Sequence, residues 1–496
     1  MKTKLLLLTL FLISSMSFSQ NTYVPDDNFE QALIDLGYDT APLDDYIPTA
    51  NINTVTYLEI NGKGINDLTG IEDFTALYHL NCTGNNLTSL DFTNNSMLYE
   101  LYCSSNSLTS LNISNLTSLD FLVCSYNNLS SLDVSTNTAL THLYCDENNI
   151  SSLDISSNSM LFTLWCNSNN LSDLDVSYNT GLYYLYCNTN NLSNLNISNN
   201  NSLIELNCSE NNISNLDVST NVDLTGLYCF YNNIGSLDVT NNVNLLTLSC
   251  GNNNLSSLDV SQNILLTHLY CGANNLTVLD VSNNTSLRSL FCTSTNLNSL
   301  DVSNNVLLED LYCYYSNISS LDLTNNTSLI TLSCSYGNFT NLDVSGNHNL
   351  VSLTCKGNNL NDLDVKNGNN INFTYFDATD NSSLTCINVD DATWSTANWT
   401  NIDAQTSFSE DCSSLATEDF EMMGFRIFPN PIYDVLNISI NEEATYSIFN
   451  INGQLFKEGK LSNGDNKVNI FHLSDGLYLV KIRTSRGVIN KKFIKM

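Results

Sequence analysis

Apolar and polar positions repeat with a period of 21 residues through most of the chain. Residues 98–119, LYELYCSSNSLTSLNISNLTSL, show the unit, in which Leu101 and Cys103 are two positions apart. Side chains two positions apart share one face of a β-strand. The pattern therefore predicts a short strand with Leu and Cys on its buried face. A fixed period of this length indicates a solenoid in which each repeat is one coil and the strands stack in parallel.

Fourteen cysteines mark this period without interruption. They are Cys82, Cys103, Cys124, Cys145, Cys166, Cys187, Cys208, Cys229, Cys250, Cys271, Cys292, Cys313, Cys334 and Cys355. Stacked cysteines on adjacent parallel strands project in the same direction, which is poor geometry for disulfide bonds. Nor does such a column supply the convergent ligands that a zinc site needs. We therefore interpret these thiols as small buried apolar residues and expect no metal site on them.

The frame L-x-x-L-x-C-x-x-N-x-L resembles the leucine-rich-repeat motif, with Cys in one of its Leu positions. The resemblance covers residues 55–384, about 16 coils, and residues 55–77 resemble a coil of the internalin type. It implies a leucine-rich-repeat solenoid with a parallel β-sheet on its concave face. No segment between the corners has the period of a long helix, so we expect a mostly irregular convex face. Residues 20–54, with a short amphipathic helix over 24–37, should form the N-terminal cap.

Two columns of asparagine accompany the cysteines. The first stands three residues after each Cys, and we expect its amides to satisfy buried backbone groups and to bridge neighbouring coils. Thr295, Ser316 and Gly337 interrupt this column, so a local irregularity is expected near residue 337. The second column, which includes Asn137 and Asn158, should form the other corner of the coil, because Asn favours tight turns and tolerates a left-handed backbone.

Two further cysteines, Cys386 and Cys412, lie outside the period, beyond the last coil. In an oxidising compartment they are expected to pair and to close a C-terminal cap over residues 385–412. Trp394 and Trp399 lie in the loop between them. Residues 413–424 follow as a predicted linker.

The first 19 residues have the pattern of a signal peptide. Lys2 and Lys4 precede an apolar run, and small residues precede Gln20. No later stretch reaches the ~18 apolar residues that a membrane-spanning helix requires, so no transmembrane segment is expected. Residues 1–19 therefore predict that the protein is exported.

The cysteines and the 21-residue period both stop before residues 425–496. This tail alternates apolar positions with turn residues, which predicts a small antiparallel β-sandwich. Its motifs also resemble the C-terminal sorting domain of cargo of the type IX secretion system, and the residues that carry the resemblance are Pro429, Asn430, Pro431, Gly453 and Gly476. The resemblance implies contact with the secretion machinery and a place in the medium or on the outer surface of a Gram-negative bacterium. An ordinary additional β-domain is the alternative.

Charge separates the solenoid from the tail. Positions 21–424 hold four basic and 44 acidic residues, a net charge of −40, whereas the tail has a net charge of +4. An acidic surface of this kind repels nucleic acid and anionic membranes, so neither is expected as a partner.

An aspartate column that includes Asp133, Asp154 and Asp175 runs along one flank. Carboxylates about 5 Å apart repel one another and favour bound cations, which suggests a Ca²⁺-stabilised structural or adhesive flank. The alternative is that each Asp bonds turn backbone and adds solubility. The motif lacks the compact spacing of a calcium loop. No cofactor is therefore predicted, with Ca²⁺ kept open.

No catalytic residues are predicted, and we do not expect an enzyme. No set of Ser, His and Asp and no phosphate loop stands out from the repeat. His79, His142 and His268 are three and six coils apart, which is too far to share one metal ion.

The residue before each repeat cysteine should point away from the core, onto the concave sheet. Eight of these fourteen residues are aromatic, and aromatic side chains give the large, rigid contact area that binding surfaces favour. The predicted ligand-binding residues, with those of neighbouring columns, are Tyr102, Tyr144, Trp165, Tyr184, Tyr186, Tyr228, Tyr270, Phe291, Tyr312 and Tyr314. We expect binding to an extracellular protein. A carbohydrate ligand is the first alternative, and cross-strand stacking without any ligand is another.

Overall fold

A computed structural model describes residues 20–412, 426–429, 431–450, 453–484 and 487–496. The chain divides into two compact units, residues 1–384 with 399–405 and residues 385–398 with 406–496. The predicted signal peptide (1–19), the predicted linker (413–424) and Asn430 lie outside the described residues. The domain boundaries expected from the sequence stay predictions.

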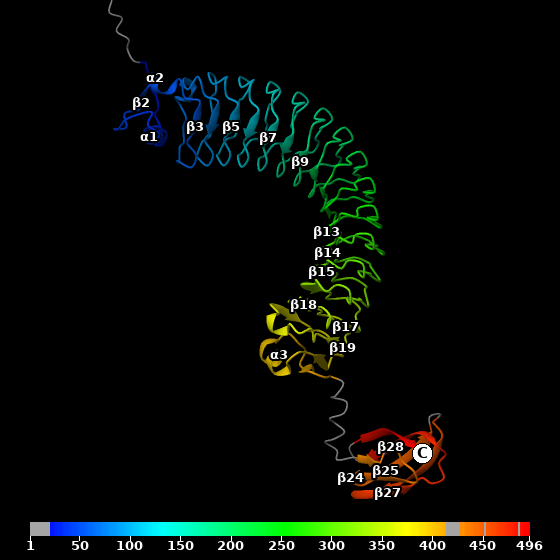
Figure 1. Cartoon of the computed structure of the whole chain (residues 1–496). Helices are drawn as coiled ribbons and strands as arrows, with labels where there is room; N and C mark the ends of the chain where they lie inside the picture. The colour runs from blue at the N-terminus through cyan, green and yellow to red at the C-terminus, as the bar shows by residue number, and fades with distance from the viewer. Residues whose placement is uncertain (1–19, 413–425, 430, 451–452, 485–486) are drawn as a thin grey trace, which may run out of the picture. The chain divides into compact units, whose positions relative to one another are not determined.

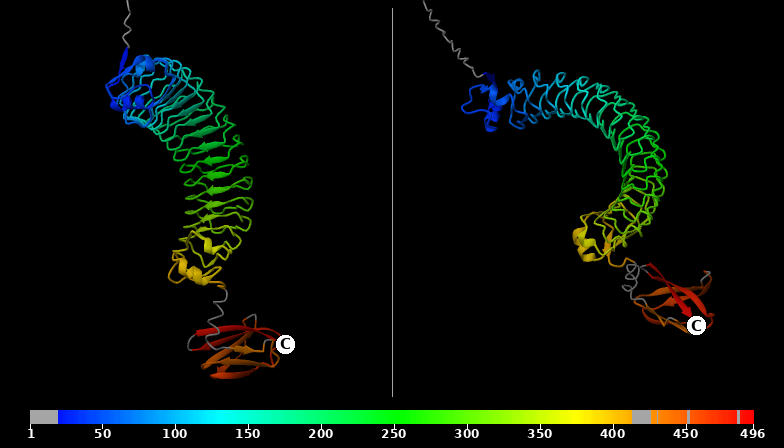
Figure 2. Two further views of the ribbon diagram at one scale, coloured as in Figure 1. Left: turned by 60° about the vertical axis from the view of Figure 1, so that its left-hand side comes forward. Right: turned by 45° about the horizontal axis from the view of Figure 1, so that its top comes forward.

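The solenoid carries one parallel sheet of 16 strands, which confirms the predicted leucine-rich-repeat architecture. Neighbouring strands pair one coil apart, as Leu206 does with Leu227. The strands follow the inner side of the curved solenoid (Figures 1 and 2). Their bounds are β3 Tyr57–Glu59, β4 His79–Asn81, β5 Glu100–Tyr102, β6 Phe121–Val123, β7 His142–Tyr144, β8 Thr163–Trp165, β9 Tyr184–Tyr186, β10 Glu205–Asn207, β11 Gly226–Tyr228, β12 Thr247–Ser249, β13 His268–Tyr270, β14 Ser289–Phe291, β15 Asp310–Tyr312, β16 Thr331–Ser333, β18 Ser352–Thr354 and β20 Tyr375–Asp377.

The core face of this sheet consists of leucine and cysteine. Leu185 and Cys187, for example, have no exposed surface. A buried aliphatic side chain of this size contributes roughly 1.5–3 kcal/mol before chain entropy is subtracted. Because each coil places the same residues at the same depth, the core is continuous along the solenoid. The fourteen repeat cysteines are all buried free thiols, as predicted.

The first asparagine column bridges neighbouring coils, as predicted. The amide nitrogen of Asn127 donates to the carbonyl oxygens of Cys124 in its own coil (3.1 Å) and Cys103 in the preceding coil (3.0 Å). Its side-chain oxygen accepts the N–H of Leu108 at 3.0 Å. Asn127 is 8% exposed. The side chain therefore satisfies buried backbone groups of two coils at the point where the chain leaves the strand.

The left-handed backbone lies at a different corner from the one predicted. Positive φ occurs two residues after each repeat cysteine, at Ser105, Tyr126, Glu147 and their equivalents, with values near 52°. Among the described residues of the solenoid, no asparagine of the second column has a positive φ. Asn137 instead is fully buried and donates to the carbonyls of Ile113 (3.0 Å) and Leu116 (2.8 Å) in the preceding coil. The column does form the predicted second corner, with turns on both sides of Asn137, but side-chain amide bonds rather than a left-handed residue complete it.

Glycine fills the left-handed position in two coils, at Gly84 and Gly357. A Cβ on Gly357, where φ is +67°, would lie 2.5 Å from a ring carbon of Tyr336. Tyr336 also stacks on Tyr315 with ring centroids 4.6 Å apart. Glycine at this position therefore serves both the backbone conformation and the close approach of the tyrosine ring.

The irregularity expected near residue 337 is present. Residues 335–337 form a turn, and the next segment adds strand β17 Asn341–Asp343, which pairs in parallel with β19 Asp362–Asp364. Gly337 has no side chain to bridge the coils, and its N–H donates to the side-chain oxygen of Asn358 at 3.1 Å. At this coil the contact between neighbouring coils therefore uses the side chain of Asn358 and only the backbone of Gly337.

The N-terminal cap is built around helix α1 Asp27–Asp35. Asp26 caps the helix, and one carboxylate oxygen accepts the N–H of Phe29 at 3.0 Å. The other oxygen accepts the N–H of Asn66 in the first coil at 2.9 Å, so one side chain joins the helix to the solenoid. The remaining elements of the cap and first coil are β1 Asn21–Tyr23, β2 Tyr46–Pro48, α2 Thr49–Ile52 and η1 Ile71–Asp73.

The convex side lacks long helices within the described solenoid. Between β3 and β20 its helical segments are η1 and η2 Asn370–Asn372, three residues each. The expected irregular convex face is therefore confirmed for these residues.

Phe376 in the last coil packs on Trp399 with centroids 4.2 Å apart, and Trp399 is 6% exposed.

The second unit begins with β21 Cys386–Asn388, which pairs in parallel with β22 Ser407–Ser409. Helix α3 Ala392–Asn398 lies between them in the sequence. A disulfide joins Cys386 to Cys412, with their Cα atoms 5.8 Å apart. Its two sulfur atoms thus tie the start of β21 to the residues that follow β22.

The tail is an antiparallel β-sandwich, as predicted. One sheet has the order β23-β24-β27 and the other β26-β25-β28-β29. Ile438, Ile448, Val480 and Phe493 form the fully buried centre between them. The strands are β23 Arg426–Phe428, β24 Val435–Ile440, β25 Ala444–Asn450, β26 Leu455–Leu461, β27 Gly464–Asn469, β28 Gly476–Thr484 and β29 Gly487–Lys495.

Candidate binding surface on the concave sheet

The 16-stranded sheet presents two columns of side chains on its concave side, which we call the concave face. The middle residue of each strand, Leu in all but β20, is buried, so the residues before and after it point the other way. On β9 these residues are Tyr184 and Tyr186, and both are half-buried. Because neighbouring strands pair directly, as Trp165 does with Tyr186, each column continues across the sheet.

Seven rings form a continuous row from β3 to β9, which we call the N-terminal ladder. Successive ring centroids lie 4.1 Å to 5.5 Å apart. The rings are those of Tyr57, His79, Tyr102, Phe121, Tyr144, Trp165 and Tyr186. Tyr57 at the end of the row is 57% exposed, and Trp165 is the most accessible of the other rings, at 37%. Its plane is inclined by 68° to Tyr144 and 47° to Tyr186, so its neighbours leave the indole face uncovered by parallel stacking.

The row of rings is interrupted at β10. Asn207 and Ser249 replace the aromatic residue on β10 and β12. The side chains of Tyr228 and Glu205 both lie over Gly226 on β11. A Cβ added to Gly226 would lie 3.2 Å from the Tyr228 ring and 3.1 Å from the Glu205 side chain. The missing side chain of Gly226 thus brings this carboxylate and this ring together.

A second row, the C-terminal ladder, covers β13 to β15. Its rings are Tyr270, Phe291 and Tyr312, with centroids 4.8 Å and then 4.2 Å apart. Phe291 and Tyr312 are nearly parallel, at 16°. Asp310 on the same strand as Tyr312 accepts a hydrogen bond from the Ser289 hydroxyl at 3.2 Å. The concave face therefore has two aromatic segments separated by a more polar one.

Apart from its histidines, the charged residues of the concave face are all acidic. On each of the 16 strands, neither of the two outward positions is occupied by Lys or Arg. The carboxylates at these positions are Glu59, Glu100, Glu205, Asp310 and Asp377. The face therefore carries a one-sided negative charge.

His79 lies between two of these carboxylates. Its Nδ1 is 2.6 Å from Glu100, and its Nε2 is 3.1 Å from Glu59. The imidazole is 6% exposed and stacks on Tyr57 with centroids 4.1 Å apart. Tyr57 in turn donates its hydroxyl to Glu59 at 2.7 Å. These contacts fix an acidic and aromatic cluster at the first strands.

The carboxylates act on the neighbouring phenols. Burial, followed by a 2.5 Å hydrogen bond to Glu205, raises the pKa of Tyr186. The pKa of Tyr228 is raised first by burial and then by the charge of Glu205, and that of Tyr270 first by burial and then by Asp310. A negative potential that keeps protons on phenols also attracts cations.

The structure brings most of the predicted binding residues together. Tyr102, Tyr144, Trp165 and Tyr186 lie in the N-terminal ladder, and Tyr270, Phe291 and Tyr312 form the C-terminal one. Tyr184 contacts the ring of Phe162 at 5.8 Å, beside the N-terminal ladder. Tyr228 lies between the ladders. Tyr314 lies beyond the strand, against Tyr315 at 5.6 Å.

Tyr57 and Glu59 are residues of this surface that sequence reasoning missed. They flank the buried Leu58 on β3, in the first coil. The same alternation of outward, buried and outward residues as in the other strands could have identified them. They were overlooked because this coil has no repeat cysteine to mark its register.

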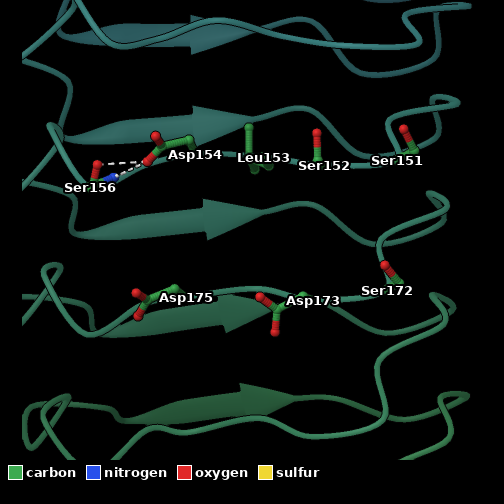
Figure 3. A pocket seen from close by; sticks show the side chains of 8 residues that line it. All are labelled: Ser151, Ser152, Leu153, Asp154, Ser156, Ser172, Asp173 and Asp175. Atoms are coloured by element: carbon green, nitrogen blue, oxygen red, sulfur yellow. Dashed lines mark hydrogen bonds between the residues drawn. The ribbon is translucent and has the colours of Figure 1, made fainter.

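The aspartate column has a role in the turns of one flank. One carboxylate oxygen of Asp154 accepts the N–H (3.0 Å) and hydroxyl (2.6 Å) of Ser156, and these bonds lower its pKa (Figure 3). Asp154, Asp173 and Asp175 from two successive coils border a depression of about 260 Å³. The bonds to Ser156 support the turn-stabilising interpretation. Binding of Ca²⁺ at this flank stays the open alternative.

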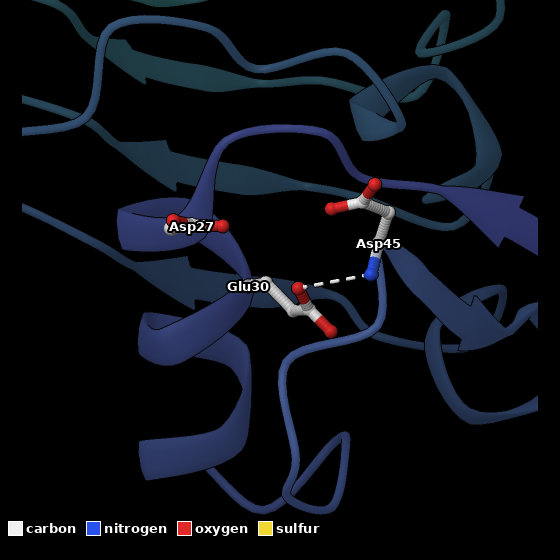
Figure 4. Close-up of side chains that lie close together, drawn as sticks. All are labelled: Asp27, Glu30 and Asp45. Carbon is white, nitrogen blue, oxygen red and sulfur yellow. Dashed lines mark hydrogen bonds between the residues drawn. The ribbon is translucent and has the colours of Figure 1, made fainter.

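A second acidic group, Asp27, Glu30 and Asp45, lies in the N-terminal cap (Figure 4). Glu30 is fully buried, and its two oxygens accept the N–H groups of Asp44 (2.8 Å) and Asp45 (3.2 Å). The Glu30 carboxylate thus holds this loop against helix α1.

The repeat thiols are chemically protected. Burial raises the pKa of Cys82, Cys208 and Cys271 to about 12. A thiol is nucleophilic and binds metal only as the thiolate. At neutral pH these side chains therefore act as core, in agreement with the interpretation from the sequence.

Residues 426–496 match a known family, described as the secretion system C-terminal sorting domain. The matched range includes the positions of all five predicted sorting residues. The tail therefore marks the protein for export by type IX secretion, to the cell surface or the outside of the cell. No helix in the part of the chain that the structure describes is long and apolar enough to cross a membrane.

The solenoid is similar to internalins. A stretch of 78 residues is 38% identical to Internalin J of Listeria monocytogenes serotype 4b, covering 16% of this chain and 8% of that protein. The functional domain of InlJ from Listeria monocytogenes, described as including a cysteine ladder, aligns with a TM-score of 0.62 and 28% identity over 96% of this chain and 99% of that one. The chain is an internalin-like leucine-rich-repeat protein with a secretion sorting tail.

More distant solved structures share the fold of this internalin-like protein. The plant peptide hormone receptor RGFR1, solved in complex with RGF2, aligns with a TM-score of 0.56 at 18% identity. The alignment covers 64% of this chain and 60% of the receptor.

Proposed function

We propose that this internalin-like protein is an exported, non-enzymatic binding protein that holds an extracellular protein partner on its concave face. The observation that carries the proposal is the N-terminal ladder, in which seven rings line one surface and the inner ring of Trp165 is 37% exposed. Aromatic residues supply much of the binding energy at protein interfaces because they bury a large area at little entropic cost.

The arrangement of the rings favours a protein partner over a carbohydrate. Phe291 and Tyr312 are inclined by 16°, and Tyr57 and His79 by 13°, so these rings cover one another's faces. Sugar rings stack on the open faces of aromatic residues. Stacked rings present edges and hydroxyl groups, which suit the mixed polar and apolar contacts of a protein surface.

Capture of extracellular proteins on the secreted protein tests this proposal. Trp165→Ala should weaken binding of a captured partner by about 30-fold, the effect of losing a central aromatic anchor. Tyr178→Ala is the matched control, because Tyr178 is 59% exposed and lies outside the concave strands. Equal binding by Trp165→Ala and the unaltered protein would overturn the proposal. Selective binding to a glycan array that depends on Trp165 would replace the protein partner by a carbohydrate.

The sorting tail supplies the secretion step of this function. Removal of residues 426–496 should leave the protein inside the outer membrane, which cell fractionation would detect. The Trp165→Ala variant with its tail intact should be exported normally. Export of the shortened chain would contradict the assignment of the tail.

A further inference from the structure

The concave face has acidic and aromatic residues grouped at regular intervals. The first group is Tyr57, Glu59, His79, Glu100 and Tyr102 on β3 to β5. The second is Trp165, Tyr186 and Glu205 on β8 to β10, and the third is Tyr270, Phe291, Asp310 and Tyr312 on β13 to β15. Successive groups are five strands apart, or about 24 Å at the spacing of β-strands.

The second group is the best defined of the three. The ring centroids of Trp165 and Tyr186 are 4.9 Å apart, and the Tyr186 hydroxyl donates to Glu205 at 2.5 Å. Gly226 on the next strand leaves room for the Glu205 side chain. An indole with an uncovered face, a phenol and a carboxylate thus lie on three consecutive strands. This is the set of groups that surrounds an ammonium or guanidinium ion in proteins.

No lysine or arginine in the described solenoid neutralises these groups, and His79 is at ion-pair distance from the carboxylates of the first group alone. Lys63, Arg288 and Lys356 form ion pairs elsewhere, with Asp35, Glu309 and Asp380 respectively. None of the basic residues at positions 21–424 stands at an outward position of the concave strands. With 44 acidic residues against four basic ones in this region, the surrounding potential is also negative.

We propose that the partner presents a basic segment, rich in arginine or lysine, which lies along the concave face with cationic side chains at the acidic and aromatic groups. This inference rests on the proposed binding function and specifies the chemistry of the partner. Cations gain from the carboxylates by charge and from the Trp165 face by cation–π interaction. An acidic segment would meet a carboxylate in every group of the face, and this repulsion between like charges excludes it.

Calorimetry with synthetic peptides tests the inference on the secreted protein. The probes are a twelve-residue peptide of alternating arginine and serine and a matched peptide of alternating glutamate and serine. We expect the arginine peptide to bind, more weakly as salt rises from 50 to 500 mM, and the glutamate peptide not to bind. Trp165→Ala should weaken binding of the arginine peptide by about 2- to 30-fold, the range for one cation–π contact. Glu205→Gln should weaken it by about 2- to 5-fold, as for one partly exposed ion pair.

The charge-matched control is Asp173→Asn, which removes one exposed carboxylate outside the concave strands. It should leave the affinity for the arginine peptide unchanged, and circular dichroism should show that all variants are folded. Equal weakening by Asp173→Asn and Glu205→Gln would reduce the binding to general charge attraction and overturn the inference. So would absence of arginine-peptide binding while a captured partner still depends on Trp165, although the proposed binding function would then stand. A captured partner insensitive to Trp165→Ala would instead remove the binding function itself.

Discussion

The asparagine three residues after most repeat cysteines gives the sharpest test of how the coils are held together. Replacing Asn127 by Ala removes the donors to Cys103 and Cys124 and the acceptor of the Leu108 N–H. Each lost hydrogen bond costs about 1 kcal/mol net, and each buried backbone group left without a partner costs about 1–3 kcal/mol. We therefore expect the free energy of unfolding to fall by about 3–5 kcal/mol.

The chain contains natural counterparts of milder substitutions. The hydroxyl of Thr295, at the same position of its coil, donates to its own Cys292 carbonyl at 2.8 Å. A hydroxyl has a single hydrogen to donate, so it cannot also donate to the preceding coil. Asn127→Thr should therefore cost less than Asn127→Ala. In the opposite direction, Thr295→Asn should raise the free energy of unfolding by about 1 kcal/mol.

Urea unfolding followed by circular dichroism measures these differences, and hydrogen exchange of the Leu108 amide reports on the bridge itself. Coincidence of the two signals checks that the solenoid unfolds cooperatively, which repeat proteins do not always do. A loss below about 1 kcal/mol for Asn127→Ala, with unchanged exchange at Leu108, would refute the reasoning. It would mean that water replaces the amide without cost.

Two further predictions concern glycine and the thiols. Gly357→Ala should lower the free energy of unfolding by about 1–3 kcal/mol, because φ is +67° and the new Cβ meets Tyr336 at 2.5 Å. Urea unfolding measures this loss. Tyr336→Ala in the same background should recover part of it. If the double variant were no more stable than Gly357→Ala, the ring contact would not be the cause. Burial raises the pKa of Cys82, Cys208 and Cys271 to about 12, so unfolding at alkaline pH releases thiol protons. The stability that the buried thiols contribute is therefore complete below pH 9 and is lost as the pH rises from about 9 towards 12. The folded protein should therefore resist a thiol reagent at pH 8, react fully in urea, and unfold at lower urea concentration at pH 10 than at pH 8; rapid labelling of the folded protein would contradict the burial of the thiols.

The turns of the coil illustrate how far local sequence could lead. The role of Asn127 followed from its place three residues after Cys124, because a buried amide at the end of a strand must bond nearby backbone. The left-handed position was not predictable in the same way. It is occupied by residues as different as Ser105, Tyr126 and Glu147, and the constraint comes from the path of the chain as it leaves the sheet.

The binding surface shows the same division. The repeat places Trp165 and Tyr186 outward because side chains alternate along a strand. The side-chain conformations decide that the two rings touch. The hydrogen bond from Tyr186 to Glu205 on the following strand depends also on the space left by Gly226. Such contacts join residues about 20 positions apart and leave no local signature in the sequence.

By itself, the sequence determined the period, the buried and outward columns, the bridging asparagines, the sandwich tail and its sorting motif. These follow from strand alternation and from residues that recur at fixed spacing, so each coil repeats the same evidence. The tertiary structure alone decided that the aromatic residues form two ladders, that His79 lies between Glu59 and Glu100, and that Arg288 and Lys356 pair with carboxylates outside the concave strands. These features depend on how unlike residues of adjacent coils meet, and that is set only when the coils stack.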